Sequence, residues 1–368
     1  PVLFSGALMR ENDQSVGGIV WAAKDLTELK QIEARSAYIR ETFGRYVSED
    51  VVAALLSAPE ALRLGGETRT VTILMSDLRG FTALAERLAP EAVVGFLNAY
   101  FDIMVALIMR YRGTINEILG DAILVIFGAP TSGEDDAERA VACAVEMQIA
   151  MERFSEERRR LGQPTVEMGI GLHTGPVIVG NIGTEQRAKY AAVGTAVNLT
   201  GRIESYTTGG QVLISEDTHR AVRAPLVVNG RMQIEPKGAK QPLTVYDIGG
   251  IGEPYDLLLA PAEDALAAIE PPIPIRCAVL EEKHVGRSVF AGTIVGLSRL
   301  RAEIVAAERA APLSNLKILL LDARGEPRPG DVYAKVLGEA TTPGAFLVRF
   351  TSVAPEVAAE LDARLPTH

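Results

Sequence analysis

One stretch of the sequence decides the fold class: Val71-Thr72-Ile73-Leu74-Met75-Ser76-Asp77-Leu78-Arg79-Gly80-Phe81-Thr82. Its apolar first half predicts a short strand that ends at Ser76 and Asp77, and a helix is expected to follow over residues 81–88. Backbone N–H groups at the start of a helix attract anions, and Gly80 lets the backbone come close to a phosphate. The stretch therefore predicts an anion-binding turn with a carboxylate beside it.

The segments around this stretch switch repeatedly between strands and helices. Residues 114–118 and 122–127 read as two strands joined by a tight turn at Leu119-Gly120-Asp121, where a glycine suits a positive φ. Further strands are expected at 166–173 and 177–181, as a pair, and at 211–215, and further helices at 91–110, 135–160 and 196–205. Hairpins interspersed with helices predict an α+β fold over residues 70–250, with helices packed on an antiparallel-rich sheet.

Two carboxylates, Asp77 and Asp121, are the first candidates for chemistry. Asp77 ends a predicted strand and Asp121 lies at the tip of a predicted hairpin, so neighbouring strands would bring both to one edge of the sheet. Oxygen ligands beside a phosphate-binding turn suit Mg²⁺. Taken singly, each residue is better explained by a helix cap or a turn, but the pair in this context favours a metal site.

A second candidate pair is Asn198 and Arg202, which share one face of a predicted helix because they are four residues apart. An amide and a guanidinium on one face can position a ribose and neutralise charge on a reacting phosphate. By spacing alone, a solvated surface pair is the simpler explanation. The same holds for Lys237, which lies in the basic turn Pro236-Lys237-Gly238-Ala239-Lys240.

The remaining segments predict a modular chain. Residues 1–26 read as a hairpin, and residues 27–69 as a helical connector that either pairs with a second copy or packs on its own domain. The proline-rich residues 251–274 predict a linker. Short apolar runs within residues 275–368 predict a small β-barrel closed by a C-terminal helix.

Composition bounds the class of protein. The 368 residues carry a net charge of −10 and no basic run, which argues against a general nucleic-acid binder. Two cysteines are too few for a zinc ribbon or a disulfide framework. No uninterrupted apolar run approaches the length of a membrane span. We expect a cytoplasmic chain without a membrane segment or nucleic-acid partner, cut from a longer protein that carries an upstream sensor.

Four motifs together resemble the class III nucleotide cyclase catalytic domain. They are Ser76-Asp77-Leu78-Arg79-Gly80-Phe81-Thr82, Leu119-Gly120-Asp121-Ala122, Gly171-Leu172-His173-Thr174-Gly175 and Val197-Asn198-Leu199-Thr200-Gly201-Arg202, in this order. The resemblance implies a homodimer with shared active sites. It also implies attack of the ribose 3′-oxygen on the α-phosphate, with release of pyrophosphate.

The resemblance also implies roles for single residues. Asp77, Asp121 and the Leu78 carbonyl of one chain would hold two Mg²⁺ or Mn²⁺ ions per site. Asn198 and Arg202 of the other chain would orient the ribose and stabilise the transition state. The remaining candidates would contact the substrate phosphates: Arg79, Gly80, Phe81, Thr82, Arg187 and Lys237.

The base-recognition positions favour GTP. Adenylate cyclases of this family usually carry Lys four residues before the second metal Asp, where this chain has Glu117, and Asp or Thr seven residues before the catalytic Asn, where it has Ala191. An ionised Glu can accept from both the N1–H and the amine of guanine. Ala191 leaves the guanine O6 without a side-chain partner. A guanylate cyclase is therefore expected, with an adenylate cyclase or a catalytically silent nucleotide sensor as alternatives.

Two weaker resemblances lie at the ends of the chain. The stretch from Gly18 to Glu28 is similar to the last strand and exit helix of a PAS sensor domain, and the stretch from Gly292 to Ser298 is similar to a PilZ domain. PilZ domains bind cyclic di-guanylate through an acid or amide that Gly296 replaces here. We therefore expect the barrel to serve interaction or dimer stability instead of binding that ligand.

Overall fold

A computed structural model describes residues 2–10, 16–27, 30–31, 51, 63–235, 241–260, 265–281, 284–340, 342 and 344–365. The chain divides into two compact units, residues 1–63 and 64–368. In the first unit, β1 (Val2–Arg10) and β2 (Val16–Asp25) pair antiparallel, which confirms the predicted hairpin. Beyond it the Lys30 N–H donates to the Leu26 carbonyl at 2.9 Å, a helical bond. Most of the predicted connector lies outside the described residues.

A mixed sheet organises residues 65–258 of the second unit. Across the described residues it has nine strands, seven of them in the order β11-β10-β8-β6-β3-β5-β4, with β7 beside β6 and β9 beside β10. The strands are β3 (Gly65–Arg79), β4 (Thr114–Leu119), β5 (Ala122–Phe127), β6 (Glu167–Thr184), β7 (Arg187–Val193), β8 (Val212–Ser215), β9 (Leu226–Ile234), β10 (Leu243–Ile251) and β11 (Leu257–Leu258). Only β6 and β8 run parallel among these pairs, so the predicted antiparallel-rich α+β fold is confirmed.

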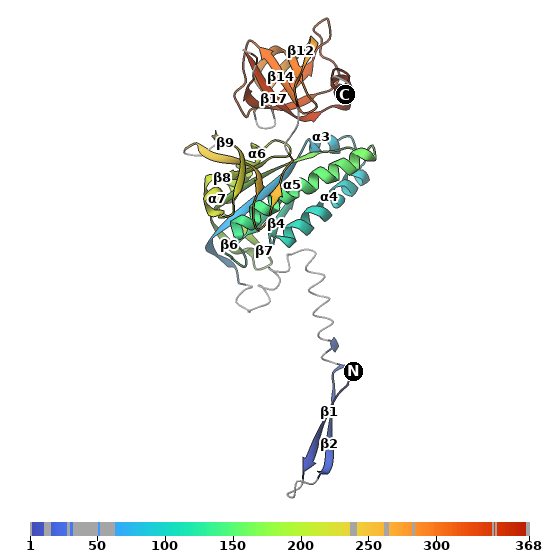
Figure 1. Cartoon of the computed structure of the whole chain (residues 1–368), viewed down its shortest axis with the longest axis vertical. Helices are drawn as coiled ribbons and strands as arrows, with labels where there is room; N and C mark the ends of the chain where they lie inside the picture. Colours follow the sequence, from blue (N-terminus) through green and yellow to red (C-terminus); the bar gives the residue numbers. More distant parts are fainter. Residues whose placement is uncertain are drawn as a thin grey trace. The chain divides into compact units, whose positions relative to one another are not determined.

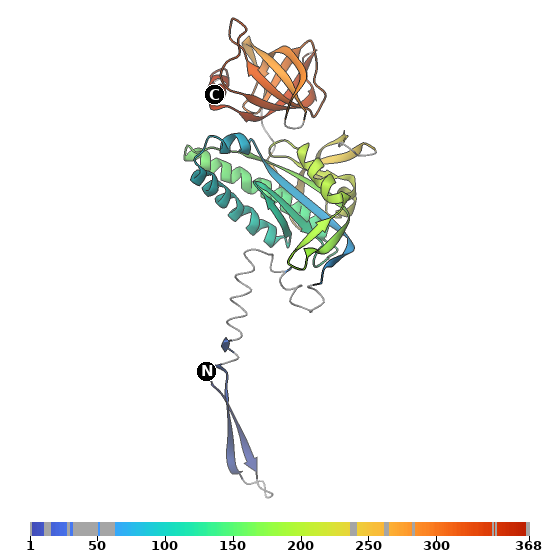
Figure 2. The ribbon, with the colours of Figure 1, turned by 180° about the vertical axis from the view of Figure 1, so that it is seen from behind.

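Two long helices cover one face of this sheet. They are α4 (Pro90–Arg110) and α5 (Asp136–Arg160), which lie side by side in both ribbon views (Figures 1 and 2). Pro90 occupies the first turn of α4, where its missing N–H costs nothing. The buried side chains of α4 recur every four residues, at Phe96, Tyr100, Met104 and Ile108. This spacing places them in one stripe against α5 and the sheet.

Helix α4 also bears on the membrane prediction. Among the described helices it is the one long and apolar enough, by length and composition, to cross a membrane. The prediction concerned uninterrupted apolar runs, and α4 is not such a run. Asn98 and Asp102 interrupt the run but leave the average hydropathy high.

The structure corrects two predicted elements near the motifs. The expected strand pair at 166–173 and 177–181 is one continuous strand, β6, paired with β3 along its length from Gly65↔Asn181 to Arg79↔Glu167. Pro176 is tolerated because it lies between the segments that pair with β8 and with β7. The expected helix at 81–88 is shorter, since α3 spans only Phe81–Ala85.

The other face of the sheet carries α6 (Thr195–Ser205), and α7 (Glu216–Ala221) follows β8. Helix α6 lies close to β6 because β6 presents glycines to it. A Cβ added at Gly171 would lie 2.4 Å from the backbone nitrogen of Glu204. The glycines of the motif at 171–175 therefore serve the approach of helix to strand.

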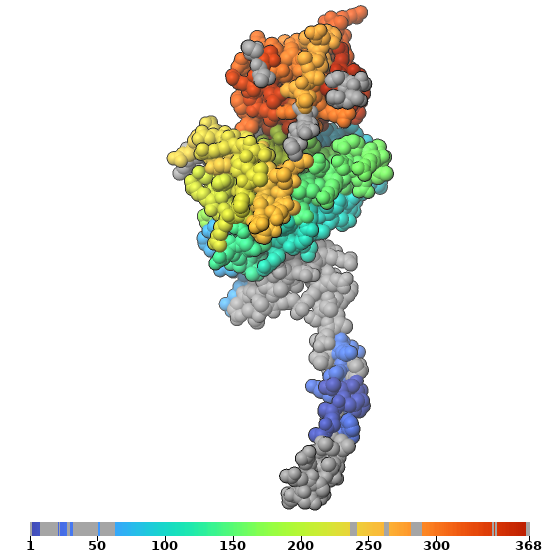
Figure 3. Space-filling model, viewed as in Figure 1, coloured from blue at the N-terminus to red at the C-terminus, as the bar shows by residue number. Residues whose placement is uncertain are grey.

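The C-terminal part is a closed barrel of six antiparallel strands within the described residues, as predicted. Its order is β12-β13-β14-β17-β16-β15. The strands are β12 (Ala267–Glu281), β13 (His284–Leu297), β14 (Arg301–Ala306), β15 (Asn315–Leu320), β16 (Val332–Glu339) and β17 (Ala345–Val353), and α8 (Pro355–Asp362) follows them. In the space-filling view the barrel strands form one closely packed body (Figure 3).

Part of the predicted linker belongs to this barrel. Strand β12 begins at Ala267, so Pro271, Pro272 and Pro274 lie within a strand. The pairing of β12 with β13 shifts register between Ala268 and Ile273. Pro271 and Pro272 fall in that irregular stretch, where the ladder does not require their missing N–H groups.

Candidate functional site

Strand pairing brings the two predicted metal carboxylates together. Ser76 on β3 lies opposite Ile123 on β5, so Asp77 lies beside the β4–β5 turn that carries Asp121. The Leu78 N–H donates to Asp121 Oδ2 at 3.2 Å. Burial, and next the neighbouring charge of Asp77, raise the pKa of the Asp121 carboxyl to about 6. The expectation that both carboxylates share one edge of the sheet is met.

This arrangement fits a divalent cation. Two close carboxylates disfavour joint ionisation, and a divalent ion would relieve their repulsion. The carbonyl of Leu78 adds a third oxygen to a donor set that contains neither sulfur nor imidazole, as Mg²⁺ or Mn²⁺ prefer. Clusters of three or more His, Cys, Asp or Glu side chains suited to a metal do not occur in the part of the chain described. The ligand roles of Asp77, Leu78 and Asp121 stay predictions.

The turn after Asp77 has the backbone conformation that its glycine requires. Gly80 has φ 76°, in the left-handed region, and precedes α3. Helix α3 has only five residues, so its dipole adds little to anion binding. The phosphate contacts predicted for residues 79–82 therefore depend on individual backbone N–H groups, including those of Phe81 and Thr82.

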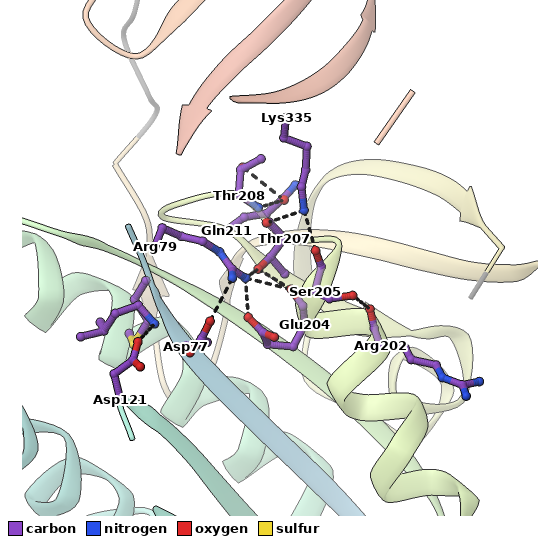
Figure 4. A network of polar contacts seen from close by, with 12 residues as sticks. Asp77, Arg79, Asp121, Arg202, Glu204, Ser205, Thr207, Thr208, Gln211 and Lys335 are labelled. Carbon is purple, nitrogen blue, oxygen red and sulfur yellow. Dashed lines mark hydrogen bonds and ion pairs between the residues drawn. The ribbon is translucent and has the colours of Figure 1, made fainter. Parts of the chain in front are cut away.

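The Arg79 side chain turns into the protein and does not extend toward a substrate. It is 14% exposed, forms an ion pair with the Glu204 carboxylate, and donates to Thr207 Oγ1 at 2.5 Å and to the Glu204 carbonyl at 2.9 Å. A longer contact of 3.3 Å reaches Asp77 Oδ2 (Figure 4). Burial raises the pKa of Glu204 to about 7, which the charge of Arg79 opposes. Glu204 and Thr207 could not be predicted as partners of Arg79, since nothing in the local sequence pattern marks them.

Helix α6 presents Asn198 and Arg202 on its exposed surface. Figure 4 shows the Arg202 guanidinium directed away from Asp77 and Asp121. The structure therefore does not bring the two candidate pairs together within one chain. This separation is what a site shared between two chains requires, because each chain would then contribute a different half.

The first base position, Glu117, lies on β4 beside β7. Its side chain is 42% exposed and pairs with Lys189 Nζ at 3.0 Å. The neighbouring Asn116 accepts a hydrogen bond from the Ala192 N–H at 3.2 Å, which fixes β4 against β7. Lys189 and Ala191 are two residues apart on β7, so they face the same side. Sequence reasoning missed Lys189, a positive group next to the predicted base-reading carboxylate.

Two of the predicted phosphate contacts receive no geometric support. Arg187 is exposed at the first position of β7, where its backbone N–H donates to Thr184 Oγ1 at 3.2 Å. Lys237 lies outside the described residues. Both phosphate contacts therefore stay predictions from the resemblance alone.

Comparison with known proteins identifies the family of this fold and site. A family model described as the adenylate and guanylate cyclase catalytic domain matches residues 66–250. The adenylate cyclase of Anabaena cylindrica is 31% identical over 221 residues, covering 56% of this chain and 43% of that protein. Adenylate cyclase 1 of Rhizobium meliloti (strain 1021) is 29% identical over 215 residues, covering 57% and 32%. This chain thus spans less than half the length of these two relatives.

A solved structure also matches the catalytic half. The crystal structure of the guanylyl cyclase Cya2 is 55% identical, with a TM-score of 0.52, and the match covers 54% of this chain and all of that one. Similar proteins therefore carry both adenylate and guanylate cyclase names. Neither the PAS nor the PilZ resemblance has support from these comparisons.

Proposed function

The chain belongs to the family of adenylate and guanylate cyclase catalytic domains, and from this premise we propose that it converts GTP to cyclic GMP and pyrophosphate. In this reaction the ribose 3′-oxygen loses its proton and bonds to the α-phosphorus, while the bond from that phosphorus to the pyrophosphate oxygen breaks. The proposal of a cyclase rests on the position of Asp77 beside Asp121, whose Oδ2 accepts a hydrogen bond from the Leu78 N–H. The presence of Glu117 at the base-recognition position supports GTP as the substrate.

Asp77, Asp121 and the Leu78 carbonyl would hold two Mg²⁺ or Mn²⁺ ions. When bound, such ions lower the pKa of the attacking hydroxyl and neutralise charge on the triphosphate. The protein supplies the fixed position of both carboxylates at the ends of paired strands. The backbone N–H groups of residues 79–82 would bind the phosphate oxygens.

We propose a homodimer with two shared sites. Asn198 of the second chain would orient the ribose, and Arg202 would neutralise charge that develops on the α-phosphate. Support comes from their exposure on α6 and from the direction of Arg202, away from its own chain's carboxylates. Exposed apolar side chains are also available for pairing, since Ile118, Leu119 and Val193 are 44%, 51% and 52% exposed.

Glu117 and Lys189 would together read guanine. The Glu117 carboxylate would accept from the N1–H and the exocyclic amine, and Lys189, 3.0 Å from that carboxylate, would donate to O6. Ala191 would leave room for the base. The 55% identity to the guanylyl cyclase Cya2 also supports GTP.

The alternative substrate is ATP, which the names of the two bacterial relatives favour. A catalytically silent nucleotide sensor is the other alternative, and the presence of all four residues Asp77, Asp121, Asn198 and Arg202 argues against it. We also propose that the protein acts in the cytoplasm, where nucleoside triphosphates and Mg²⁺ are abundant.

The decisive experiment offers the purified protein equimolar GTP and ATP with Mn²⁺ and identifies the cyclic product by mass. We expect cyclic GMP to dominate, and Glu117→Lys to depress GTP turnover sharply. Combining Glu117→Lys with Ala191→Thr should raise the relative use of ATP. A wild-type preference for ATP, or an unchanged ratio of GTP to ATP turnover in Glu117→Lys, would refute the GTP assignment and favour an adenylate cyclase.

A further inference from the structure

The end of helix α6 is held by a lysine from the barrel. Lys335 on β16 is 3% exposed, and its Nζ donates to the Ser205 carbonyl at 2.5 Å and to the Thr207 carbonyl at 3.1 Å (Figure 4). The last carbonyls of a helix lack intrahelical partners and carry partial negative charge. Lys335 therefore caps α6, although it lies about 130 residues away in the sequence.

The same segment is bound from the opposite side by Arg79. Thr207 accepts from Arg79 through its hydroxyl and from Lys335 through its carbonyl. Arg79 also holds the carboxylate and carbonyl of Glu204, and it follows Asp77 by two residues on β3. Lys335, the 204–207 segment and Arg79 thus form one continuous polar network. It joins the barrel, the helix that carries Arg202 and the strand that carries Asp77.

The network brings two basic side chains close to one buried carboxyl. The basic groups are Lys335 and Arg79, and the carboxyl is Glu204. Burial, and next the charge of Arg79, lower the pKa of Lys335 to about 7, which the charge of Glu204 opposes. A buried lysine with no partner would be costly, because its ammonium loses water without compensation. Among the described residues, Lys335 Nζ donates to the carbonyls of Ser205 and Thr207, at the end of α6 and in the loop after it.

A separate contact reaches the turn beside Asp77. The Thr351 carbonyl on β17 lies so close to Gly80 that a Cβ added there would be 3.0 Å from it. Arg349 on β17 also pairs with Glu167 at 2.8 Å, at the start of β6. This ion pair has no hydrogen bond to α6 or to residues 205–207 among the described contacts, although Glu167 packs against Gly209 further along the loop, so it provides a comparison for the Lys335 contact.

We propose that the C-terminal barrel positions the catalytic helix, and that Lys335 is the positioning residue. By capping α6 it would fix where Asn198 and Arg202 stand relative to the strand that bears Asp77. A displaced α6 would still allow substrate binding through the turn at 79–82. It would misplace the groups that act on the transition state, so loss of Lys335 should lower kcat more than it changes KM.

The test compares Lys335→Met, which keeps the stem but removes the donors, with the conservative Lys335→Arg. Two controls are Arg349→Met, which removes the ion pair between β17 and the start of β6, and Lys317→Met. Lys317 pairs at 2.7 Å with Asp331, also in the barrel. Each variant is assayed in the full chain for kcat, KM, melting temperature and hydrogen exchange of the backbone amides at 204–208.

For Lys335→Met we expect kcat to fall on the order of tenfold or more, with KM within about twofold. The Thr207 amide, which donates to the Glu204 carbonyl at 2.8 Å, should exchange on the order of tenfold faster. Lys335→Arg should recover part of both, and neither control should change kcat. Wild-type kcat and exchange in Lys335→Met, or an equal loss of kcat in Arg349→Met, would overturn the assignment.

If Lys335→Met does not fold, Lys335→Arg takes its place in both assays, and Thr207→Val tests the Arg79 side of the same network. Thr207→Val removes the hydroxyl that accepts from Arg79 but leaves the carbonyl that accepts from Lys335. It should also lower kcat more than it changes KM. The measurements of kcat and KM rest on the proposed cyclase activity, whereas the hydrogen-exchange measurement does not. A protein that makes no cyclic nucleotide would therefore refute the proposed function, and the exchange rates would still decide the role of Lys335.

Discussion

Asp121→Asn should stabilise the metal-free protein while it abolishes cyclisation. The pKa of Asp121 is raised from its ordinary 3.8 to about 6, by burial and then by Asp77. A pKa unit corresponds to ~1.36 kcal/mol, so ionisation of this carboxyl in the fold costs about 3 kcal/mol before screening. Because the group is partly exposed, solvent reduces this cost to about 1 kcal/mol. An asparagine at this position still offers an oxygen to the Leu78 N–H.

The sign of the pH dependence follows from the raised pKa. Between about pH 4 and 6 the folded state holds a proton on Asp121 that the unfolded state has released, so this group makes wild type less stable as the pH rises. The advantage of Asp121→Asn should therefore be about 1 kcal/mol at pH 7.5, or roughly 2–4 °C in melting temperature, and should be almost gone near pH 4.

The assay is thermal unfolding in a chelator across this pH range, repeated with Mn²⁺. The matched control is Asp102→Asn, which removes the same charge from an exposed position on α4. Mn²⁺ should stabilise wild type more than Asp121→Asn. The reasoning fails if Asp121→Asn is no more stable than wild type at pH 7.5, or if its advantage is the same at every pH.

Three further outcomes are expected. Lys189→Met should lower kcat/KM for GTP about tenfold in initial-rate assays, with little change in melting temperature because an exposed ion pair contributes ~1 kcal/mol or less. Mixing Asp77→Ala chains with Asn198→Ala chains should restore cyclic nucleotide synthesis, and no recovery in proven heterodimers would exclude shared sites. Gly171→Ala should lower the free energy of unfolding by about 1–3 kcal/mol in urea titrations, since its Cβ would strike the backbone of α6. Its control, Gly95→Ala in α4, meets open space and should be neutral or stabilising.

Local patterns were enough for most helices and hairpins. The Pro90 start and four-residue apolar spacing of α4, and the hairpin turn at Gly120, both depend on residues close in the chain. The same is true of the motif at Asp77, where strand, carboxylate and glycine follow one another. These features could be predicted because their physical causes, helical periodicity and the φ freedom of glycine, act over a few residues.

Predictions failed where a partner strand overrode a local signal. Two paired strands were expected at 166–173 and 177–181, but pairing with β3 keeps β6 continuous through Gly175 and Pro176. Pro271 and Pro272 suggested a linker, but the barrel accommodates both in an irregular stretch of β12. In each case the neighbouring strand decides whether a missing N–H matters, and the sequence does not reveal that neighbour.

The sequence by itself determined the class of fold and the candidate residues Asp77, Asp121, Asn198 and Arg202. Only the tertiary structure decided how they are connected. Arg79 has its partners at Glu204 and Thr207, and Thr207 is held in turn by Lys335 of the barrel. These contacts join segments more than 120 residues apart. A buried charge pairs with whichever group the fold brings near. The partner therefore cannot be predicted from any periodic pattern in the sequence.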